Sequence, residues 1–162
     1  ATRRRYAAAA ALCAAAVLTK PLGAVCVPVL VGCLIRDRSA RSALAALVAG
    51  FATAVVVALP FAVGMPPTWL PSLYLGALEA YPYAGMNAFN ASAFLGGNWT
   101  PLGVRDFVLP FGVWGSIGLL LALGGAAVLP LIERLEPGSR PLVAGALGAF
   151  GVFVLSHGMH ER

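Results

Sequence analysis

The sequence predicts an all-α protein whose helices cross a lipid bilayer several times, and two observations support this. First, 60% of its 162 residues are apolar and only 10% are charged, whereas soluble domains are typically about half apolar and about a quarter charged. Second, segments 42–63 and 111–132 contain no charged side chain, and about 20 apolar residues in a helix cross a hydrocarbon core of ~30 Å. We expect about three full spans and a broken helical hairpin.

The net charge of +5 does not indicate a nucleic-acid-binding protein. The basic residues cluster at the ends of apolar runs, which is typical of the cytoplasmic loops of proteins with several membrane spans. The three cysteines all lie in the first apolar region, without the spacing of metal ligands. Free thiols that act as small apolar side chains are the simplest interpretation.

The first apolar region, 6–35, is interrupted by Thr19-Lys20-Pro21. Pro21 has no N–H and disfavours helix at Lys20, and each half is only about 20 Å long as a helix. The region is therefore one kinked span or a hairpin with Lys20 at its tip. Arginines precede it at 3–5 and follow it at 36–41. Only a hairpin places both groups in the cytoplasm, so we predict the hairpin.

The remaining elements follow in order. Segment 42–63 leaves the cytoplasm as a full span, and 64–110 is a long extracytoplasmic loop rich in Pro, Gly, Asn and aromatic residues. Segment 111–132 returns to a short cytoplasmic turn, and 141–157 crosses outward again. This topology places all but three of the 11 basic residues in the cytoplasm, the exceptions being Lys20, Arg105 and Arg162. We expect Gly145, Gly148 and Gly151 to pack the last helix tightly against a neighbour.

Lys20 is the first residue that could carry chemistry. Ionisable groups at membrane depth usually face a cavity or a partner. Two helix ends meet at this break, and residues 22–25 could offer backbone N–H groups to an anion such as a phosphate. A lysine that extends to the membrane interface explains the same pattern. Both interpretations stay open on this feature alone.

The outer loop combines aromatic rings with amide side chains. Residues 69–79 are typical of a helix lying at the membrane interface. Tyr83, Asn87 and Asn90 follow, and such residues suit a sugar, because rings cover its apolar face and amides pair with its hydroxyl groups. An ordinary interfacial aromatic belt has the same composition. Glu79 and Asp106 are the only carboxylates of the loop.

Residues 157–162 form the densest polar cluster. His157 and His160 lie beside Glu161 and could bind a metal ion, but the chain offers no obvious third ligand, so we predict no metal site without excluding a divalent ion. Arg162 could instead hold a phosphate or carboxylate at the outer end of the helix. A solvated helix end is the structural alternative.

Three stretches in order resemble bacterial GT-C membrane glycosyltransferases, similar to the dolichyl-phosphate-glucose and -mannose transferases. They are Leu-Thr-Lys-Pro at 18–21, the loop Tyr-Pro-Tyr at 81–83 with Asn-Ala-Phe-Asn at 87–90 and Leu-Gly-Gly-Asn-Trp at 95–99, and Met-His-Glu-Arg at 159–162. The resemblance covers nearly the whole chain. Two features depart from the family's pattern. Asn90 is followed by Ala91 and Ser92, where the family often has Leu-Trp. The family's Met-His-Glu-Arg stretch usually continues with Tyr, whereas the given sequence ends at Arg162.

The resemblance implies a hexosyltransferase of the cell envelope. It would transfer a sugar from a polyprenyl-phosphate carrier, which is a substrate and not a cofactor, to an acceptor on the extracytoplasmic face of the plasma membrane. Its partners would be membrane lipid, the lipid-linked sugar and a glycan, lipid or protein acceptor, and no nucleic acid.

The resemblance also implies roles for individual residues. The donor phosphate would be bound by Lys20, Arg162 and His160. The sugar would be bound, or the loop ordered, by Asn87, Asn90, Tyr83 and Glu161. The family's catalytic carboxylate lies in a first outer loop that this sequence does not contain, with Glu79 and Asp106 as weaker candidates. We therefore expect the chain to be a piece of a longer enzyme, inactive by itself.

Two other classes of function are compatible with the sequence. One is a membrane transporter with a substrate site at the broken helix, and the other is a non-catalytic membrane subunit. Transporters of this kind usually contain paired repeats, and the sequence contains no internal repeat.

Overall fold

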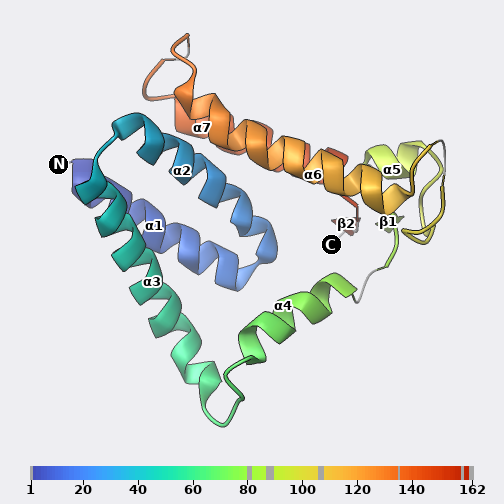
Figure 1. The fold of residues 1–162 in the computed structure, drawn as a ribbon, viewed down its shortest axis with the longest axis horizontal. Coiled ribbons are helices and arrows are strands. Elements are labelled where there is room, and N and C mark those ends of the chain that lie inside the picture. Colours follow the sequence, from blue (N-terminus) through green and yellow to red (C-terminus); the bar gives the residue numbers. More distant parts are fainter. Residues whose placement is uncertain are drawn as a thin grey trace. The chain divides into compact units, whose positions relative to one another are not determined.

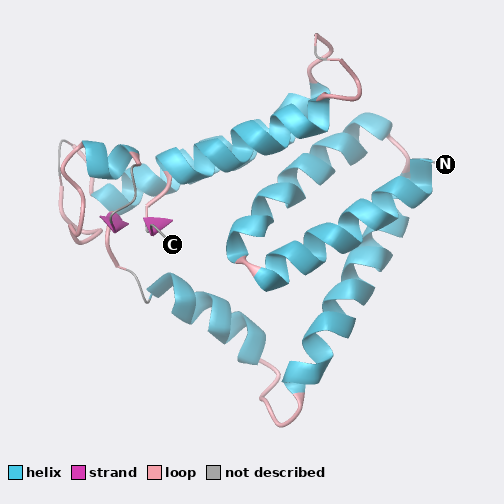
Figure 2. Cartoon of the chain, turned by 180° about the vertical axis from the view of Figure 1, so that it is seen from behind, coloured by secondary structure: helices cyan, strands magenta, loops and turns pink. Residues whose placement is uncertain are grey.

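The computed structural model describes residues 2–79, 82–86, 90–105, 108–134, 136–157 and 159–160, without the side chains of 2–4, 77–79 and 159–160. The described chain is mostly helical, so the predicted all-α class is confirmed (Figure 1 and Figure 2). Its elements are α1 (Thr2–Thr19), the 3₁₀ helix η1 (Pro21–Val25), α2 (Cys26–Asp37), α3 (Ala40–Ala62), α4 (Trp69–Glu79), β1 (Gly85–Met86), α5 (Ala91–Phe94), α6 (Phe111–Val128), the 3₁₀ helix η2 (Leu129–Leu131), α7 (Arg140–Leu155) and β2 (Met159–His160).

The chain divides into two compact units. Unit 1 comprises Ala1–Trp69 and Gly125–Ala146, and unit 2 comprises Leu70–Gly124 and Leu147–Arg162. Unit 1 therefore holds the first three helices, and unit 2 holds the loop region. Both α6 and α7 contribute residues to each unit.

The chain reverses between α1 and α2. Lys20 has an extended backbone, with φ −151° and ψ 124°, and Pro21 opens η1. Proline fits the first position of a helix because its missing N–H would have no partner there. The returning chain is held by a hydrogen bond of 3.1 Å from the Tyr6 hydroxyl to the Cys33 carbonyl. Gly23 permits the close turn, since a Cβ there would lie 2.6 Å from the Ala16 backbone.

The helix α3 begins at a capped turn and packs on α1. Arg38 ends α2 in the left-handed region, with φ 50°, and the Ser39 hydroxyl accepts a hydrogen bond of 3.2 Å from the Ser42 N–H. This is the usual N-cap contact, which satisfies one of the unpaired amides of a first turn. The Gly50 position lies against Ala10 of α1, 3.5 Å from its carbonyl oxygen to a Cβ built there.

Two arginines bind backbone carbonyls at and after η2 in unit 1. The Arg36 guanidinium donates to the carbonyls of Pro130, at 3.0 Å, and Leu131, at 3.4 Å. Arg140, which is buried, donates to the Glu133 carbonyl at 2.9 Å. The last carbonyls of a helix lack partners within it, so these arginines satisfy acceptors at and after the end of η2.

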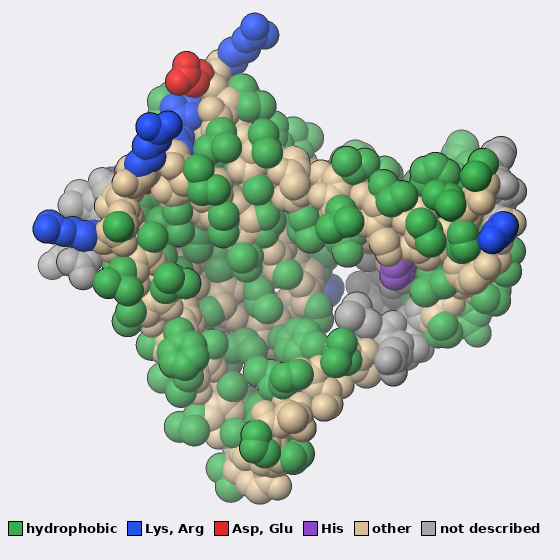
Figure 3. All heavy atoms as spheres, in the orientation of Figure 1, with side chains coloured by type: hydrophobic (Ala, Val, Ile, Leu, Met, Phe, Trp, Pro, Cys, Tyr) green, Lys and Arg blue, Asp and Glu red, His purple; other side chains and the backbone are tan. Residues whose placement is uncertain are grey.

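Burial in this chain is the reverse of that in a soluble protein. Many buried side chains are small, among them Ala10, Ala46, Ala122, Ala126 and Ala144, whereas large apolar side chains such as Leu47, Phe51 and Leu120 are exposed. Figure 3 shows hydrophobic side chains over much of the visible surface. Large apolar residues are normally buried in soluble domains. Small residues at helix contacts are typical of helices that pack in lipid.

Two helices are long and apolar enough to cross a membrane, Ala40–Ala62 and Phe111–Leu131. Only 6% of the apolar window of the first and 17% of that of the second is buried, whereas the core helix of a soluble protein would be mostly buried. The third full span that we expected at 141–157 is shorter in the structure. Helix α7 has 16 residues and is thus only ~24 Å long at 1.5 Å per residue, because the chain turns toward β2 after Leu155.

The predicted glycine packing is seen in part. Gly151 faces Ala122 of α6, whose Cβ would be 3.0 Å from a Cβ at the glycine, and Gly148 is buried. Gly145 has open space instead, with no described atom within 4 Å of such a Cβ. The contact between α6 and α7 therefore depends on the glycines nearer the end of α7.

Gly32 provides a test of small-residue packing. Its missing Cβ would collide with the backbone oxygen of Ala127, so Gly32→Ala should destabilise the protein by about 1–3 kcal/mol, the usual cost of overpacking. Gly145→Ala is the matched control, because it adds the same methyl group to a helix where space is open, and it should be neutral or slightly stabilising. Unfolding of both variants in detergent micelles would measure the difference. Equal stability of the two would show that the contact at Gly32 is not needed.

Candidate functional site

The loop region of unit 2 is organised around residues 82–86. On one side, the Ala84 N–H donates to the Thr100 carbonyl at 2.8 Å, and the Gly85 carbonyl accepts from the Trp99 N–H at 2.8 Å. On the other side, β1 pairs in parallel with β2, so that Gly85 lies opposite Met159 and Met86 opposite His160. The Tyr-Pro-Tyr loop and the Met-His-Glu-Arg stretch thus meet through their backbones.

Asn90 makes a second connection between these stretches. Its side-chain oxygen accepts from the Ala93 N–H at 2.9 Å and caps α5. Its side-chain nitrogen donates to the Ser156 carbonyl at 3.3 Å, just beyond α7. The residue is only 4% exposed. Of the two roles predicted for Asn90, these contacts are those of a residue that orders the loop.

An aromatic pair lies beside the same loop. The rings of Tyr83 and Trp99 meet edge to face, with centroids 5.6 Å apart and planes at 66°, which is a favourable geometry for aromatic side chains. Trp99 is 52% exposed, and its φ of 58° lies in the left-handed region. Non-glycine residues are uncommon there and cluster at functional sites. Trp99 is the last residue of the Leu-Gly-Gly-Asn-Trp stretch, and its aromatic partner could not be predicted from the sequence.

The end of α7 approaches α6 through glycines. A Cβ at Gly115 would lie 2.6 Å from the His157 backbone nitrogen, and one at Gly118 would lie 2.5 Å from the Leu155 carbonyl oxygen. These two glycines therefore allow the residues after α7 to contact α6 directly. This contact brings His157 to within 3.4 Å of Ser116, measured from Nε2 to Oγ.

The contacts of Ser116 indicate the state of His157. The Ser116 hydroxyl donates to the Gly112 carbonyl at 2.7 Å, so its oxygen can accept from His157 in the tautomer that carries the proton on Nε2. Burial lowers the pKa of His157 from its ordinary value of 6.5. The neutral form of the imidazole is therefore favoured at pH 7.

An apolar hollow of about 350 Å³ lies next to these residues. Its lining begins at Ala91 and Ser92, directly after Asn90, and continues along α6 to Leu121. Phe111, Trp114 and Leu155 complete its apolar walls. The volume is within the range of about 300–1,000 Å³ that is usual for ligand pockets.

Lys20 belongs to unit 1, whereas the residues described above belong to unit 2. It is exposed at the tip of the hairpin between α1 and η1. The Gly23 N–H donates to the Lys20 carbonyl at 2.8 Å, so this amide is used within its own turn. The predicted association of Lys20 with the 159–162 stretch stays a prediction.

Several predicted site residues lie outside the part of the chain that the structure describes. They are Asn87, Asp106, Glu161 and Arg162, together with the side chains of Glu79, which ends α4, and His160, which lies in β2. Among the described residues, no group of three or more His, Cys, Asp or Glu side chains could hold a metal ion.

The described residues thus form a mostly helical protein with two helices of membrane length. Hydrogen bonds connect its loop at 82–105 to the chain that follows α7. No protein-family model matches the chain, and comparisons with curated proteins and with solved structures find no match.

Two variants of Asn90 separate its two contacts. Asn90→Ser retains an oxygen that can cap α5 but cannot reach the Ser156 carbonyl, whereas Asn90→Ala loses both contacts. Loss of the cap typically costs ~1 kcal/mol, so hydrogen exchange at the Ala93 amide should accelerate in Asn90→Ala and much less in Asn90→Ser. Exchange at Met159 and His160 should accelerate in both variants. Unchanged protection of these two residues would mean that Asn90 does not order the connection to β2.

Proposed function

We propose that the chain is the membrane-embedded part of a glycosyltransferase that takes its sugar from a polyprenyl-phosphate carrier. The observation that carries this proposal is the pairing of β1 with β2, reinforced by the bond between Asn90 and Ser156, which are 66 positions apart. Two of the three stretches that resemble GT-C enzymes are therefore adjacent within one unit. The ladder holds the loop and the helix end side by side, as a shared site would require.

The surrounding residues suit a lipid-linked sugar. An exposed ring such as that of Trp99 can cover the apolar face of a sugar, and Tyr83 holds it from the edge. The apolar hollow beside Asn90 suits the first isoprene units of the carrier, because its lining residues are apolar apart from Ser92. Sugar and lipid tail would thus lie on the two sides of the phosphate.

The chemistry follows from the charge that develops during transfer. The leaving phosphate gains negative charge, and preorganised cations stabilise this charge most strongly in a site from which water is excluded. Arg162 and Lys20 are the proposed cations, since the neutral form of His157 is favoured at pH 7. A carboxylate would act as general base toward the acceptor hydroxyl, a role typically worth about 10²–10⁴ in rate.

The proposal includes insertion in the plasma membrane with several spans and with the loop region outside. The distribution of arginines supports this orientation, because Arg5, Arg38 and Arg41 lie together at one end of unit 1, where Arg36 and Arg140 bind carbonyl groups. Lys and Arg residues next to the ends of membrane spans are found mainly on the cytoplasmic side.

Cysteine labelling tests the orientation. In a background without the three native cysteines, a membrane-impermeant maleimide applied from outside should modify Ser72→Cys. It should not modify Ser39→Cys or Ser139→Cys until the membrane is permeabilised. The reverse pattern would place the loop region in the cytoplasm and rule out extracytoplasmic transfer by this site.

Binding of the donor tests the function itself. Arg162→Ala and Lys20→Ala should each weaken binding of radiolabelled polyprenyl-phosphate mannose or glucose in proteoliposomes by roughly tenfold to a hundredfold, because a charge-assisted contact is worth ~1.5–3 kcal/mol. Arg105→Ala is the control, since it removes an exposed cation of the outer loop that belongs to none of the three stretches. Wild-type affinity in both test variants, or absence of donor binding by the unmodified chain, would contradict the proposal.

A further inference from the structure

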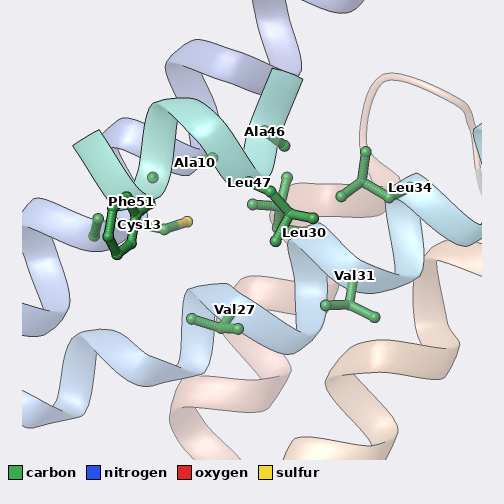
Figure 4. A pocket seen from close by; sticks show the side chains of 11 residues that line it. Ala10, Cys13, Val27, Leu30, Val31, Leu34, Ala46, Leu47 and Phe51 are labelled. Atoms are coloured by element: carbon green, nitrogen blue, oxygen red, sulfur yellow. The ribbon is translucent and has the colours of Figure 1, made fainter. Parts of the chain in front are cut away.

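Unit 1 contains an apolar groove of about 330 Å³ between α2 and α3. Helix α1 forms its floor with Ala10 and Cys13, α2 forms one wall with Leu30 and Val31, and α3 forms the other with Leu47 and Phe51 (Figure 4). All of these residues belong to the same compact unit. The groove therefore lies within one compact unit of the chain.

The shape of the groove follows from the sizes of its residues. The floor is lined by small side chains and lies deep, since Ala10 is buried, as is Ala46 at the foot of the α3 wall. The walls are large and apolar and stand outward, with Leu47 71% and Phe51 74% exposed. A slot with a small floor and high apolar walls fits a single linear hydrocarbon chain. It offers almost no polar partner to water.

One end of the groove carries positive charge. The turn at Arg38 and Ser39 joins α2 to α3 and so closes the groove there. Arg38 is exposed in this turn, and Arg41 is exposed in the first turn of α3. The bond from Tyr6 to Cys33 brings the start of α1, with exposed Arg5, to the same end. Figure 3 shows basic side chains gathered where α2 ends and α3 begins.

The charges at this end do not cancel, because basic residues outnumber acidic ones even when Glu133 and Glu136 after η2 are counted with Asp37. Asp37 is the carboxylate nearest to the turn in sequence, and it lies between Arg36 and Arg38. Arg36 is engaged with the carbonyls of Pro130 and Leu131. The positive end of the α3 dipole adds to the charge of Arg38 and Arg41. An anion is therefore favoured at the closed end of an otherwise apolar groove.

The backbone at Arg38 gives this residue particular weight. Its φ of 50° lies in the left-handed region, where a helix usually ends in glycine because a side chain is strained there. An arginine at this position keeps a positive charge at a site where glycine would be more stable. Backbone strain of this kind accumulates at functional sites.

We propose that the groove binds an anionic glycerophospholipid, with one acyl chain between α2 and α3 and its phosphate at Arg38 and Arg41. The proposal rests on membrane insertion of unit 1 but not on sugar transfer. The positive-inside bias places this lipid in the cytoplasmic leaflet. It is therefore separate from the proposed donor site on the extracytoplasmic face.

Competition between two lipids tests the proposal. The chain, purified in a mild detergent, is mixed with equal amounts of phosphatidylglycerol and phosphatidylcholine that have identical acyl chains, and retained lipid is counted by native mass spectrometry. We expect one phosphatidylglycerol per chain in clear excess over phosphatidylcholine. Arg38→Gly and Arg41→Gln should each reduce its retention by roughly fivefold, since a basic residue at an anionic lipid is worth ~1 kcal/mol.

Matched controls separate the lipid site from general effects of charge and hydrophobicity. Arg134→Gln removes an exposed arginine of the same unit that belongs neither to the groove lining nor to the turn between α2 and α3, and it should leave retention unchanged. Leu47→Asn alters an exposed groove wall, whereas Leu44→Asn alters an exposed leucine of α3 that does not line the groove. Only Leu47→Asn should lower retention, severalfold. Arg38→Gly should unfold no more easily than the unmodified chain, because it relieves backbone strain.

Several results would overturn the proposal. Equal retention of the two lipids would show that the arginines select no headgroup. Equal effects of Arg38→Gly and Arg134→Gln, or of Leu47→Asn and Leu44→Asn, would show that bound lipid lies elsewhere. A lipid-free dimer whose stability falls in Leu47→Asn would show that a second copy of the chain covers the groove.

Discussion

Close contact between helices through small residues is the constraint on which this structure depends. Gly32 lies against the Ala127 backbone, Gly50 against Ala10, and Gly118 against the Leu155 carbonyl. The contacts at Gly32 and Gly118 leave no space even for a Cβ, and that at Gly50 brings a Cβ into van der Waals contact. The large apolar residues of α3 and α6 are exposed instead. A surface of this kind favours lipid over water, because water would be in contact with leucine, valine and phenylalanine along two helices of membrane length.

The same constraint positions the candidate site. His157 approaches Ser116 only because Gly115 and Gly118 let the chain beyond α7 lie directly on α6. From there the chain continues into β2 and meets the loop that Asn90 orders. Several backbone amides and carbonyls among the described residues of this region are paired with one another, which avoids the cost of unpaired polar groups. The described part of the loop is thus held in place by hydrogen bonds within unit 2, and Trp99 is exposed on it.

The arginines divide into two groups with different physical roles. Arg36 and Arg140 donate to backbone carbonyls of η2 and of the turn that follows it. They thereby satisfy acceptors that have no partner within a helix. Arg38 and Arg41 are exposed at the start of α3. The first group stabilises the fold and the second supports the proposed lipid site. Counting charges along the sequence does not separate these groups, because all four residues stand at the ends of apolar runs.

Local chemistry explains what could be predicted from the sequence alone. The break at Lys20 follows from the missing N–H of Pro21, and helices at 42–63 and 111–132 follow from long apolar runs, so the all-α class and two membrane-length helices could be read directly. The true length of α7, the loop-ordering contacts of Asn90 and the neutral state of His157 could not. The contacts of Asn90 depend on Ser156, and the neutral state of His157 depends on its burial against α6, both far along the chain. Only tertiary packing decides such contacts, since they form where glycines bring two helices together and no local pattern of residues specifies the partner.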